Sequence, residues 1–595
     1  MKRTLLFLAA LAMLLSCGKD PSGTGDNKDK EVQIAVAPTA IILEGNQTSS
    51  TFTLSCNTAW TVTTEADWIT AITPSSGETA DGTVITVTST ENDGDLRTTM
   101  LTVTAGKATK IILVSQSEAA GKETFGQAYL MKATILEDSK GFNMLSDGDF
   151  EDTGDQAVCG GASSWWALYS ERVEGGALSG DAYVRLNHDD IDENLGFQTV
   201  CTKPNTEYTV SAWFLSNQAS GNPDTYFGVR IGTGIRPINF EERLGDDFTT
   251  SWKQFSKTGN VGNNPISEAF AFGFHKEGYI ISWDNVVFKR PGDTQKSYGL
   301  TNMEHVKPIY GMTGGAITSG DGCTVWDGGD GKVRFAFGKN VGDGELATRE
   351  NAFGVMSSDD KIDVVKADGK VKEIIPKGSK EGGILPTAGI AAGGKQWIHY
   401  QIIRTKEFGA HLWRAWGGGL AYSEDGTTWT RSDVSFDKGG NFMQVAFLKE
   451  DGYVYMFGSH VARANEENTA VADEHYVKLA RCPEAEMGTQ NSWKYWNGAE
   501  WVTGENNAIP IIYTGTLGEF SVIKNQTTGR YLMIYMSLKR HAVVVRDAAS
   551  PEGDWSGEHI LYPLKENENI YAPSFMPASA SGNTVYFVMS SAWEE

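Results

Sequence analysis

The sequence predicts an all-β protein built from an immunoglobulin-like sandwich, a jelly-roll sandwich and a five-bladed β-propeller. The first observation is a strand pattern, a glycine followed by alternating aromatic or β-branched residues, which is typical of a half-buried strand leaving a tight turn. It starts at five places, Gly331, Gly394, Gly452, Gly529 and Gly582. Their irregular spacing suits propeller blades with uneven loops better than a solenoid. The second observation is that short alternating strands separated by turns fill residues 32–117, as in an antiparallel sandwich.

Composition agrees with an exported protein of several modules. The chain has 595 residues, a net charge of -24 and 67 glycines, with 17 Trp, 20 Tyr and 26 Phe. The length predicts three or four domains. So negative a chain is a poor partner for nucleic acid or anionic lipid surfaces. The many aromatic rings favour carbohydrate handling only mildly, because any β core is also rich in them.

The first 31 residues are predicted to be a targeting signal followed by a tether. Lys2 and Arg3 precede an apolar run that is too short to span a bilayer. The run ends in LLSC at Cys17, which resembles the lipobox of bacterial lipoproteins. The resemblance implies a signal peptide at residues 1–16, lipidation of Cys17, and a chain held at the outer membrane or cell surface through this lipid alone. A plain secretory signal is the alternative. Residues 17–31 then form a flexible tether.

Residues 32–117 contain NTAWTV, ADWITAITPSSG and KATKIILVSQ in that order. This order resembles the BACON domain, an immunoglobulin-like module common in surface proteins of gut Bacteroidota. Trp60 and Trp68 stand where such modules keep packing aromatics. We therefore expect a spacer, with sugar binding by these two side chains as the alternative.

A polar linker is predicted at residues 118–142 and a second sandwich at residues 143–290. The opening DGDFE and the closing SWDNVVFKR resemble the motifs at the first and last strands of jelly-roll carbohydrate-binding modules found beside xylanases and laminarinases. In such modules a Glu and a closing Asp often bind a structural calcium ion, which here implies Glu151 and Asp284 as ligands. Hydrogen bonding of these carboxylates to backbone amides is the alternative.

Three aromatic residues of this module, Trp165, Trp166 and Tyr169, lie in a Gly/Ser-rich loop where a core does not need them. We interpret them as a carbohydrate-binding platform, with packing as the alternative.

Residues 300–595 are interpreted as the propeller. The segments TRENAFGVMSSD, ILPTAGI, GGLAYSEDGTTWTRSD, LGEFSV and GRYLMIY occur in this order. They resemble a formerly uncharacterised group of bacterial five-bladed propellers that includes endo-acting D-arabinanases. The sequence stops soon after the strand VYFVMS, so the propeller is either truncated at its C-terminus or closed by strands near Gly299 to Pro308.

The resemblance implies two catalytic aspartates on the first blade, because glycoside cleavage needs a carboxylic acid and a second carboxylate. Their positions hold Ala316 and Lys339 here. Asp321 and Asp327, from an acidic stretch between those positions, and Glu519, in LGEFSV, are the candidate replacements. Turn formation and hydrogen bonding within a blade are the alternatives.

Arg414 and Trp416, in AHLWRAWGGG, are predicted to contact sugar, with blade packing as the alternative. Together these features predict a surface-anchored lipoprotein that binds an extracellular polysaccharide. An active endo-hydrolase of D-arabinan or a similar furanoside polymer, using relocated carboxylates, is one alternative. A non-catalytic adhesion or scaffold protein is the other. No cofactor beyond the implied calcium is expected, and no nucleic acid.

Overall fold

The computed structural model consists of β-strands and short 3-10 helices in two compact units, Met1–Glu123 and Thr124–Glu595. It describes residues 32–592 except 38–39, 44–47, 93–96, 117–126, 168–169, 187–193, 220–225, 233–237, 245–248, 275–278, 344, 406–412, 437–439, 461–474, 516 and 566–568. The predicted signal peptide, Cys17 and the tether lie outside these residues. Within them, no helix has the length and apolar character required to cross a membrane. The all-β prediction is confirmed.

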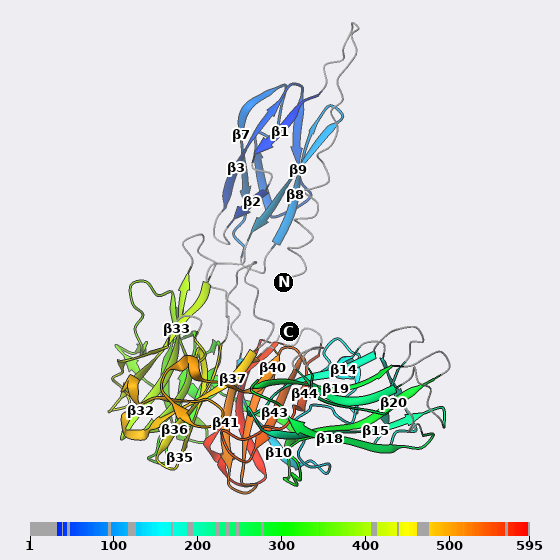
Figure 1. Ribbon diagram of the computed structural model, residues 1–595. Coiled ribbons are helices and arrows are strands. Elements are labelled where there is room, and N and C mark those ends of the chain that lie inside the picture. The colour runs from blue at the N-terminus through cyan, green and yellow to red at the C-terminus, as the bar shows by residue number, and fades with distance from the viewer. Residues whose placement is uncertain are drawn as a thin grey trace. The chain divides into compact units, whose positions relative to one another are not determined.

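The first unit is a two-sheet sandwich (Figure 1). One sheet has the order β1 (Ile34–Ala37), β3 (Ser49–Cys56), β7 (Ala80–Ser89) and β5 (Ile69–Thr73). The other has the order β2 (Ala40–Leu43), β9 (Ala108–Gln116), β8 (Arg97–Ala105), β4 (Trp60–Thr63) and β6 (Ser76–Gly77). Trp60 is buried between the sheets, and the guanidinium of Arg97 lies 4.5 Å from the ring centroid of the half-buried Trp68. Both tryptophans therefore pack as the spacer interpretation expects.

The second sandwich has two five-stranded sheets, as in a jelly roll. The first sheet has the order β11 (Trp166–Ala167), β14 (Asn194–Cys201), β19 (Ile266–Phe274), β16 (Tyr226–Gly232) and β17 (Ile238–Leu244). The second has the order β12 (Ser170–Glu174), β13 (Ala182–Leu186), β20 (Ile281–Lys289), β15 (Glu207–Ser216) and β18 (Lys253–Asn260). Alternating burial along β15, whose even-numbered residues are buried, shows which side chains form the core between the sheets.

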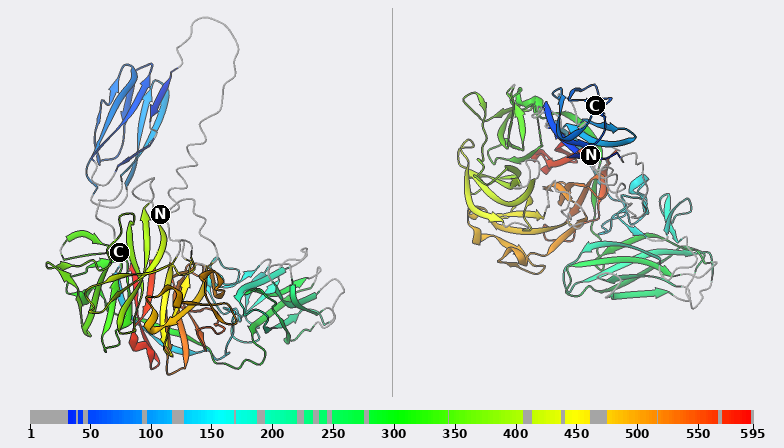
Figure 2. Two further views of the ribbon diagram at one scale, coloured as in Figure 1. Left: turned by 60° about the vertical axis from the view of Figure 1, so that its left-hand side comes forward. Right: turned by 90° about the horizontal axis from the view of Figure 1, so that it is seen from above.

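Five sheets surround a central axis and form the propeller (Figure 2, right). The first four blades, each written from the inner strand outward, are listed here with their bounds: β23 (Cys323–Asp327), β24 (Val333–Phe337), β27 (Ala352–Ser358), β28 (Lys361–Val364); β31 (Gly383–Ala392), β32 (Lys395–Thr405), β33 (Trp413–Ser423), β34 (Thr430–Phe436); β35 (Gln444–Glu450), β36 (Tyr453–Ser459), β37 (His475–Pro483), β38 (Lys494–Trp496), β39 (Trp501–Val502), with β40 (Pro510–Gly515) also on β37; β41 (Leu517–Asn525), β42 (Arg530–Ser537), β43 (Ala542–Ala548), β44 (His559–Pro563).

The fifth blade joins the C-terminal strands to strands on both sides of the jelly roll. Its order is β45 (Asn569–Phe575), β46 (Thr584–Ala592), β10 (Gln127–Glu137) and β21 (Tyr298–Pro308). The jelly roll is therefore inserted between the two outer strands of this blade. The expected closure near Gly299 to Pro308 is what the structure shows. The linker prediction for residues 118–142 was wrong over β10, whose buried Leu130 and Met131 serve the cores of the propeller.

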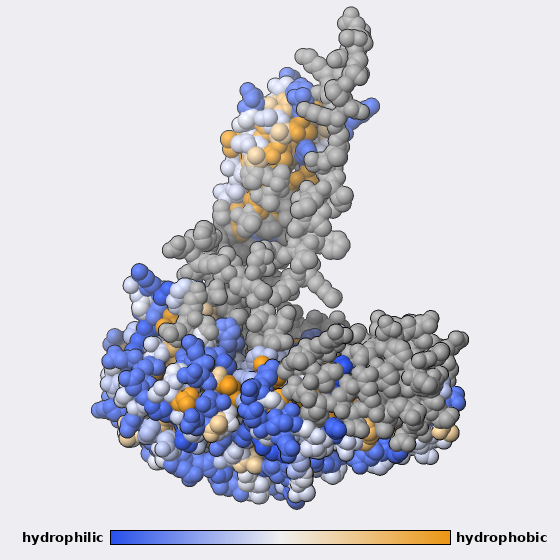
Figure 3. Space-filling model, in the orientation of Figure 1, coloured by the Kyte–Doolittle hydropathy of each residue, from blue (hydrophilic) through white to orange (hydrophobic). Residues whose placement is uncertain are grey.

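The smaller elements connect these sheets. They are β22 (Ser319–Gly320), β25 (Asn340–Gly342), β26 (Glu345–Arg349), β29 (Lys366–Ala367), β30 (Lys370–Val371), η1 (Gly154–Gln156), η2 (Tyr310–Thr313), η3 (Glu484–Glu486), η4 (Gln490–Ser492), η5 (Glu505–Asn507) and η6 (Pro577–Ala580). The visible face of the propeller is mostly hydrophilic (Figure 3), in keeping with the acidic composition.

The recurring glycines occupy equivalent places in the five blades. Gly331, Gly394, Gly452, Gly529 and Gly582 each precede the second strand of a blade, and each has a positive φ between 69° and 82°. A residue with a side chain is strained in this conformation, so glycine is favoured at this turn. The repeat in the sequence is thus the turn from the inner strand to the second strand.

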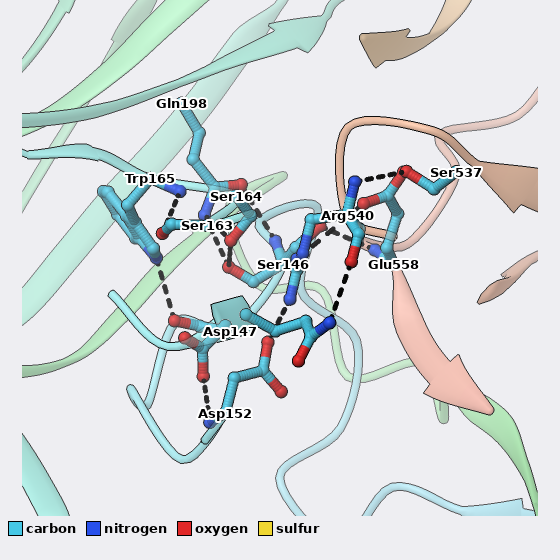
Figure 4. A network of polar contacts seen from close by, with 12 residues as sticks. Ser146, Asp147, Asp152, Ser163, Ser164, Trp165, Gln198, Ser537, Arg540 and Glu558 are labelled. Atoms are coloured by element: carbon cyan, nitrogen blue, oxygen red, sulfur yellow. Dashed lines mark hydrogen bonds and ion pairs between the residues drawn. The ribbon is translucent and has the colours of Figure 1, made fainter. Parts of the chain in front are cut away.

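A buried arginine joins the jelly roll to the propeller (Figure 4). Arg540, between β42 and β43, is 1% exposed, and its guanidinium pairs with Asp152 of the jelly-roll opening loop. Its backbone carbonyl accepts a hydrogen bond of 3.1 Å from Nε2 of Gln156. Its Nη1 lies 3.7 Å from Oε2 of Glu558, so the charge of Arg540 is shared between carboxylates of both modules.

A second polar contact between the modules surrounds Asp554 of the propeller. Its Oδ2 accepts from Nε of Arg290 at 2.5 Å, and its Oδ1 accepts from the hydroxyl of Tyr208 at 3.0 Å. Both partners belong to the jelly roll. Charge-assisted hydrogen bonds of this kind are stronger than neutral ones, so two separate anchors hold the inserted module against the propeller.

Candidate functional site

One face of the jelly roll, opposite its core, carries a transverse row of side chains. Trp166 on β11 stands directly across from Phe197 on β14. Phe197 in turn stands across from Phe270 on β19, and Phe270 is paired with Arg230 on β16. The ring centroids are 4.8 Å apart for Trp166 and Phe197, and 5.1 Å apart for Phe197 and Phe270. The guanidinium of Arg230 lies 4.4 Å from the centroid of Phe270. Cross-strand pairs of this kind stabilise each other, so the row supports Trp166.

Trp166 is the accessible end of this row. Trp166 is 47% exposed, whereas Phe270 and Arg230 are buried. A half-exposed indole backed by a second ring offers a flat apolar surface at a low cost in conformational entropy. This is the arrangement that stacking against the C–H face of a sugar ring requires. The role of Trp166 as a platform stays a prediction.

Trp165 does not belong to the platform, and its prediction was wrong. It is 4% exposed, packs in the jelly-roll core beside Phe150 at 5.5 Å, and donates from Nε1 to the carbonyl of Asp147 at 2.9 Å. Adjacent residues in extended chain point to opposite faces, so only one of the two tryptophans can face outward. Tyr169 lies outside the described residues.

Glu151 and Asp284, the carboxylates of the opening and closing motifs of the jelly roll, bind backbone amides of the loop before β13. Both oxygens of Glu151 accept from the N–H of Asp181, at 2.9 and 3.1 Å. The fully buried Asp284 accepts from the N–H of Leu178 at 2.9 Å and of Asn285 at 2.6 Å. Burial raises the pKa of Asp284, and these amide hydrogen bonds oppose that shift.

These contacts match the amide alternative for Glu151 and Asp284. In the described part of the chain, no three His, Cys, Asp or Glu side chains gather in a way that could hold a metal ion. Two carboxylates already bound to N–H groups are a poor start for the six to eight oxygen ligands of calcium. Calcium binding here stays a prediction.

The propeller mouth forms where the five inner strands begin. These strands, β23, β31, β35, β41 and β45, contact one another in a ring around the channel. A cavity of about 50 Å³ lies at their N-terminal ends, and a second cavity of about 240 Å³ continues toward their C-terminal ends. The polar residues that line the mouth cavity are Asp321, Thr324, Thr387, Gln444, Glu519 and Ser574.

Three of the five inner strands are irregular at this mouth. The register of β31 shifts at Thr387, that of β41 shifts at Gly518 and Glu519, and that of β45 shifts at Ala572 and Pro573. An extra residue in one strand re-aims side chains and interrupts pairing, which is common beside functional sites. Irregular pairing therefore accompanies both Thr387 and Glu519 where they line the mouth.

The candidate carboxylates separate into two groups. Asp321, two residues before β23, and Glu519 line the mouth cavity together. Asp327, at the far end of β23, lines the second cavity instead. The structure therefore brings two of the three predicted carboxylates to one place and moves Asp327 away from them.

Ala316 and Lys339, at the two positions where the propeller resemblance implies aspartates, have different surroundings. Ala316 is 4% exposed and packs in a core of the first blade. Lys339 is half-buried, and its carbonyl accepts from the N–H of Asp321 at 2.8 Å. Burial raises the pKa of Glu350, and the charges of Lys377 and then Lys339 oppose that shift. Sequence reasoning did not single out Thr387, which lines the mouth cavity, because a threonine at a strand irregularity has no recognisable pattern.

Of the two predicted sugar contacts, Arg414 and Trp416, only the side chain of Trp416 is described, and it is not among the residues that line the mouth cavity. Both lie on β33, the third strand of its blade. Trp416 is half-buried, and the guanidinium of Arg404 lies 4.3 Å from its ring centroid. The side chain of Arg414 lies outside the described set. This geometry favours packing for Trp416.

The fold therefore defines an all-β chain with an immunoglobulin-like sandwich and a five-bladed propeller that carries an inserted jelly roll. Residues 33–119 match the viral BACON domain. Residues 313–595 match a domain of unknown function, DUF4185. The resemblance to BACON is thereby confirmed. No curated protein matches the chain.

Solved structures similar to parts of the chain include a family 16 carbohydrate-binding module, at 18% identity over 25% of this chain and 100% of that one, with a TM-score of 0.20. TmCBM61 in complex with β-1,4-galactotriose matches at 14% identity over 25% of this chain and 99% of that one, with a TM-score of 0.19. A GH43_1 enzyme from Xanthomonas citri matches at 12% identity over 45% of this chain and 86% of that one, with a TM-score of 0.29.

Proposed function

We propose that this chain binds an extracellular polysaccharide through the jelly roll, with Trp166 as the stacking platform. The observation that carries the proposal is the exposed indole at the end of the cross-strand row, 47% exposed and 4.8 Å from the ring of Phe197. An isolated exposed tryptophan needs no explanation. A tryptophan held by a second aromatic ring on a sheet face, opposite the core, is a surface suited to sugar.

Anchoring at the cell surface belongs to the same proposal. Its support is the lipobox-like end of the apolar run at Cys17, followed by a polar tether. A lipid at Cys17 would keep both sandwiches and the propeller outside the cell, where polysaccharides occur. Metabolic labelling with a fatty-acid analogue, compared between wild type and Cys17→Ala, tests this part.

Hydrolysis is the second candidate function. It is favoured by the presence of Asp321 and Glu519 in one mouth cavity, since glycoside cleavage needs two carboxylates that flank the bond. In this scheme the acid protonates the leaving oxygen while the other carboxylate activates water or attacks the sugar. Furanoside polymers such as D-arabinan are the class that the propeller resemblance implies.

One experiment separates these functions. The purified chain is incubated with arabinan and a panel of polysaccharides, and new reducing ends are measured beside retardation in polysaccharide affinity gels. Retardation without product supports binding alone. Product that disappears in Glu519→Gln and Asp321→Asn, but not in Asp327→Asn, supports a hydrolase. If the chain shows no retardation and releases no product, only a scaffold role remains and the proposed function is refuted.

A further inference from the structure

Two cations stand directly opposite each other on the third blade of the propeller, β35 to β39. Arg481 on β37 is the cross-strand partner of Lys494 on β38, so both side chains lie on one face of the sheet. Leu479 and Trp496 lie on the same face and pack in the core shared with the fourth blade. Like charges directly opposite each other destabilise a sheet. The pair of Arg481 and Lys494 therefore has a cost that packing does not explain.

No carboxylate of the described chain neutralises this pair. Within those residues, neither the guanidinium of Arg481 nor the ammonium of Lys494 forms an ion pair. Glu450, on the inner strand of the same blade, is already bound by Lys524 and by the hydroxyl of Tyr531. Two positive charges therefore share one sheet face without a bound counter-charge.

Aromatic rings hold the guanidinium of Arg481 in place. It lies 4.4 Å from the ring centroid of Tyr453, 4.2 Å from that of Trp501 and 5.9 Å from that of Tyr455. Its Nη1 donates to the hydroxyl of Tyr455 at 3.3 Å, which is the one hydrogen bond of this side chain within the described residues. A stacked arginine keeps its planar fork of donors, which fits two oxygens of a carboxylate or a sulfate.

The surroundings of the two cations suit an anionic group that is carried by a sugar. Tyr453 and Trp501 are half-buried, as are Arg481 and Lys494, so part of each ring remains accessible beside the charges. Such rings offer apolar surface to the C–H groups of a sugar while the cations bind its acidic substituent. An anion between the cations would also remove their mutual repulsion.

One carboxylate of the fourth blade, Glu552, opposes a bound anion. Burial raises the pKa of Tyr455, the hydrogen bond and charge of Arg481 oppose that shift, and the charge of Glu552 adds to it. Glu552 is therefore close enough to weaken anion binding. The net charge of -24 acts less strongly, because exposed charges more than about 8 Å apart are largely screened at physiological ionic strength.

We propose that this face of the third blade binds an acidic polysaccharide, with Arg481 and Lys494 holding a carboxylate or sulfate group of the sugar. The proposal rests on the proposed function and adds to it a second site, on the propeller, with its own class of ligand. Neutral polysaccharides lack the group that these two cations recognise.

The test uses the full chain with Trp166→Ala, so that the jelly-roll platform does not contribute. Affinity gels contain polygalacturonate or its carboxyl-reduced form, and dextran sulfate or dextran. We expect at least one acidic polymer to bind about tenfold or more tightly than its neutral counterpart. Adding Arg481→Met or Lys494→Met should remove most of this difference, and adding Glu552→Gln should increase it.

Lys361→Met is the matched control, because it removes an exposed cation that already pairs with Asp363 on the first blade. It should leave the affinity for acidic polymers unchanged. Thermal midpoints are measured for every variant. Lys494→Met should be at least as stable as its parent, since it removes a like charge, so its loss of binding cannot be assigned to unfolding.

Each outcome decides the proposal. Binding of the carboxylated polymer alone, or of the sulfated polymer alone, supports it and identifies the anionic group. Unchanged binding in both Arg481→Met and Lys494→Met, an equal loss in Lys361→Met, or equal binding of duplex DNA overturns it. Binding of neutral polysaccharides alone, with Trp166 intact, overturns the second site and leaves the proposed function standing. Absence of binding to any polysaccharide by the wild type refutes both.

Discussion

Trp165 and Trp166 are neighbours in the sequence and lie on opposite faces of one jelly-roll sheet. Trp165 is 4% exposed in the core, and Trp166 is 47% exposed on the other face. The pair therefore provides its own control, since the same substitution at the two positions changes stability in one case and the outer surface in the other.

Trp165→Ala should destabilise the jelly roll by about 3 to 5 kcal/mol, because it removes a large buried ring and leaves a cavity. The loss includes the hydrogen bond from Nε1 to the carbonyl of Asp147. Thermal unfolding followed by tryptophan fluorescence measures this change. Trp166→Ala should shift the midpoint far less, and equal shifts in the two variants would contradict the assignment of the two faces.

Replacing Arg540 should loosen the jelly roll from the propeller. Arg540→Met leaves the carboxylate of Asp152 without its buried partner, and removing one member of a buried ion pair costs about 3 to 5 kcal/mol. Limited proteolysis at the module boundary, compared with wild type, reports the change. Lys140→Met is the control, because its pair with Asp149 is more exposed. Unchanged proteolysis in Arg540→Met would contradict this prediction and show that the contacts of Asp554 alone hold the jelly roll against the propeller.

Asp147→Asn should raise stability at neutral pH. Oδ2 of Asp147 is buried without a hydrogen-bond partner, while Oδ1 accepts from the N–H of Asp152 at 2.9 Å. Burial, and next the charge of Asp152, raise the pKa of Asp147 well above its usual value, against the opposing charges of Arg540 and Arg172. An orphaned buried group of this kind costs about 1 to 3 kcal/mol.

The pH dependence of this effect has a definite sign. A carboxyl whose folded pKa is raised binds its proton more tightly in the folded state, so its contribution to stability is complete below about pH 4 and is lost as pH rises through the folded pKa. The advantage of Asp147→Asn should therefore grow between pH 4 and pH 8. Thermal midpoints at several pH values measure it. An advantage largest at low pH would contradict the assignment.

Closure of the propeller should depend on the strands that flank the jelly roll. A chain that begins at Thr124 retains all four strands of the fifth blade, whereas residues 313–595 alone lack β10 and β21. The shorter chain would leave the edge of β46 unpaired, which favours aggregation. We expect cooperative unfolding of the first chain and aggregation of the second. A monomeric, cooperatively folding 313–595 would refute this closure.

Much of the propeller could be predicted because its signal is local. The turn before the second strand of each blade requires a positive φ, so Gly331 and its four counterparts recur in the sequence. Strand β10 gave no such signal. It is separated from its partner β21 by the whole jelly roll, and a strand that pairs across such an insertion resembles a linker until its partner is known.

The candidate site could be predicted only in part, for a similar reason. Glu519 and Asp321 were found as carboxylates in suitable segments. Their convergence depends on ring closure and on irregular register in the inner strands, neither of which leaves a pattern in composition. Alternation was the neglected signal for Trp165 and Trp166, because adjacent residues of an extended segment, here Trp165 and the first residue of β11, point to opposite faces.

Retention on polysaccharide affinity gels tests the central proposal most directly, using wild type, Trp166→Phe and Trp166→Ala on one panel. We predict that at least one polysaccharide retards the wild type, that Trp166→Phe keeps part of the affinity, and that Trp166→Ala loses about tenfold or more. All three proteins should have similar thermal midpoints. Equal retardation of wild type and Trp166→Ala by every polysaccharide that binds, or no retardation of the wild type, would contradict the account.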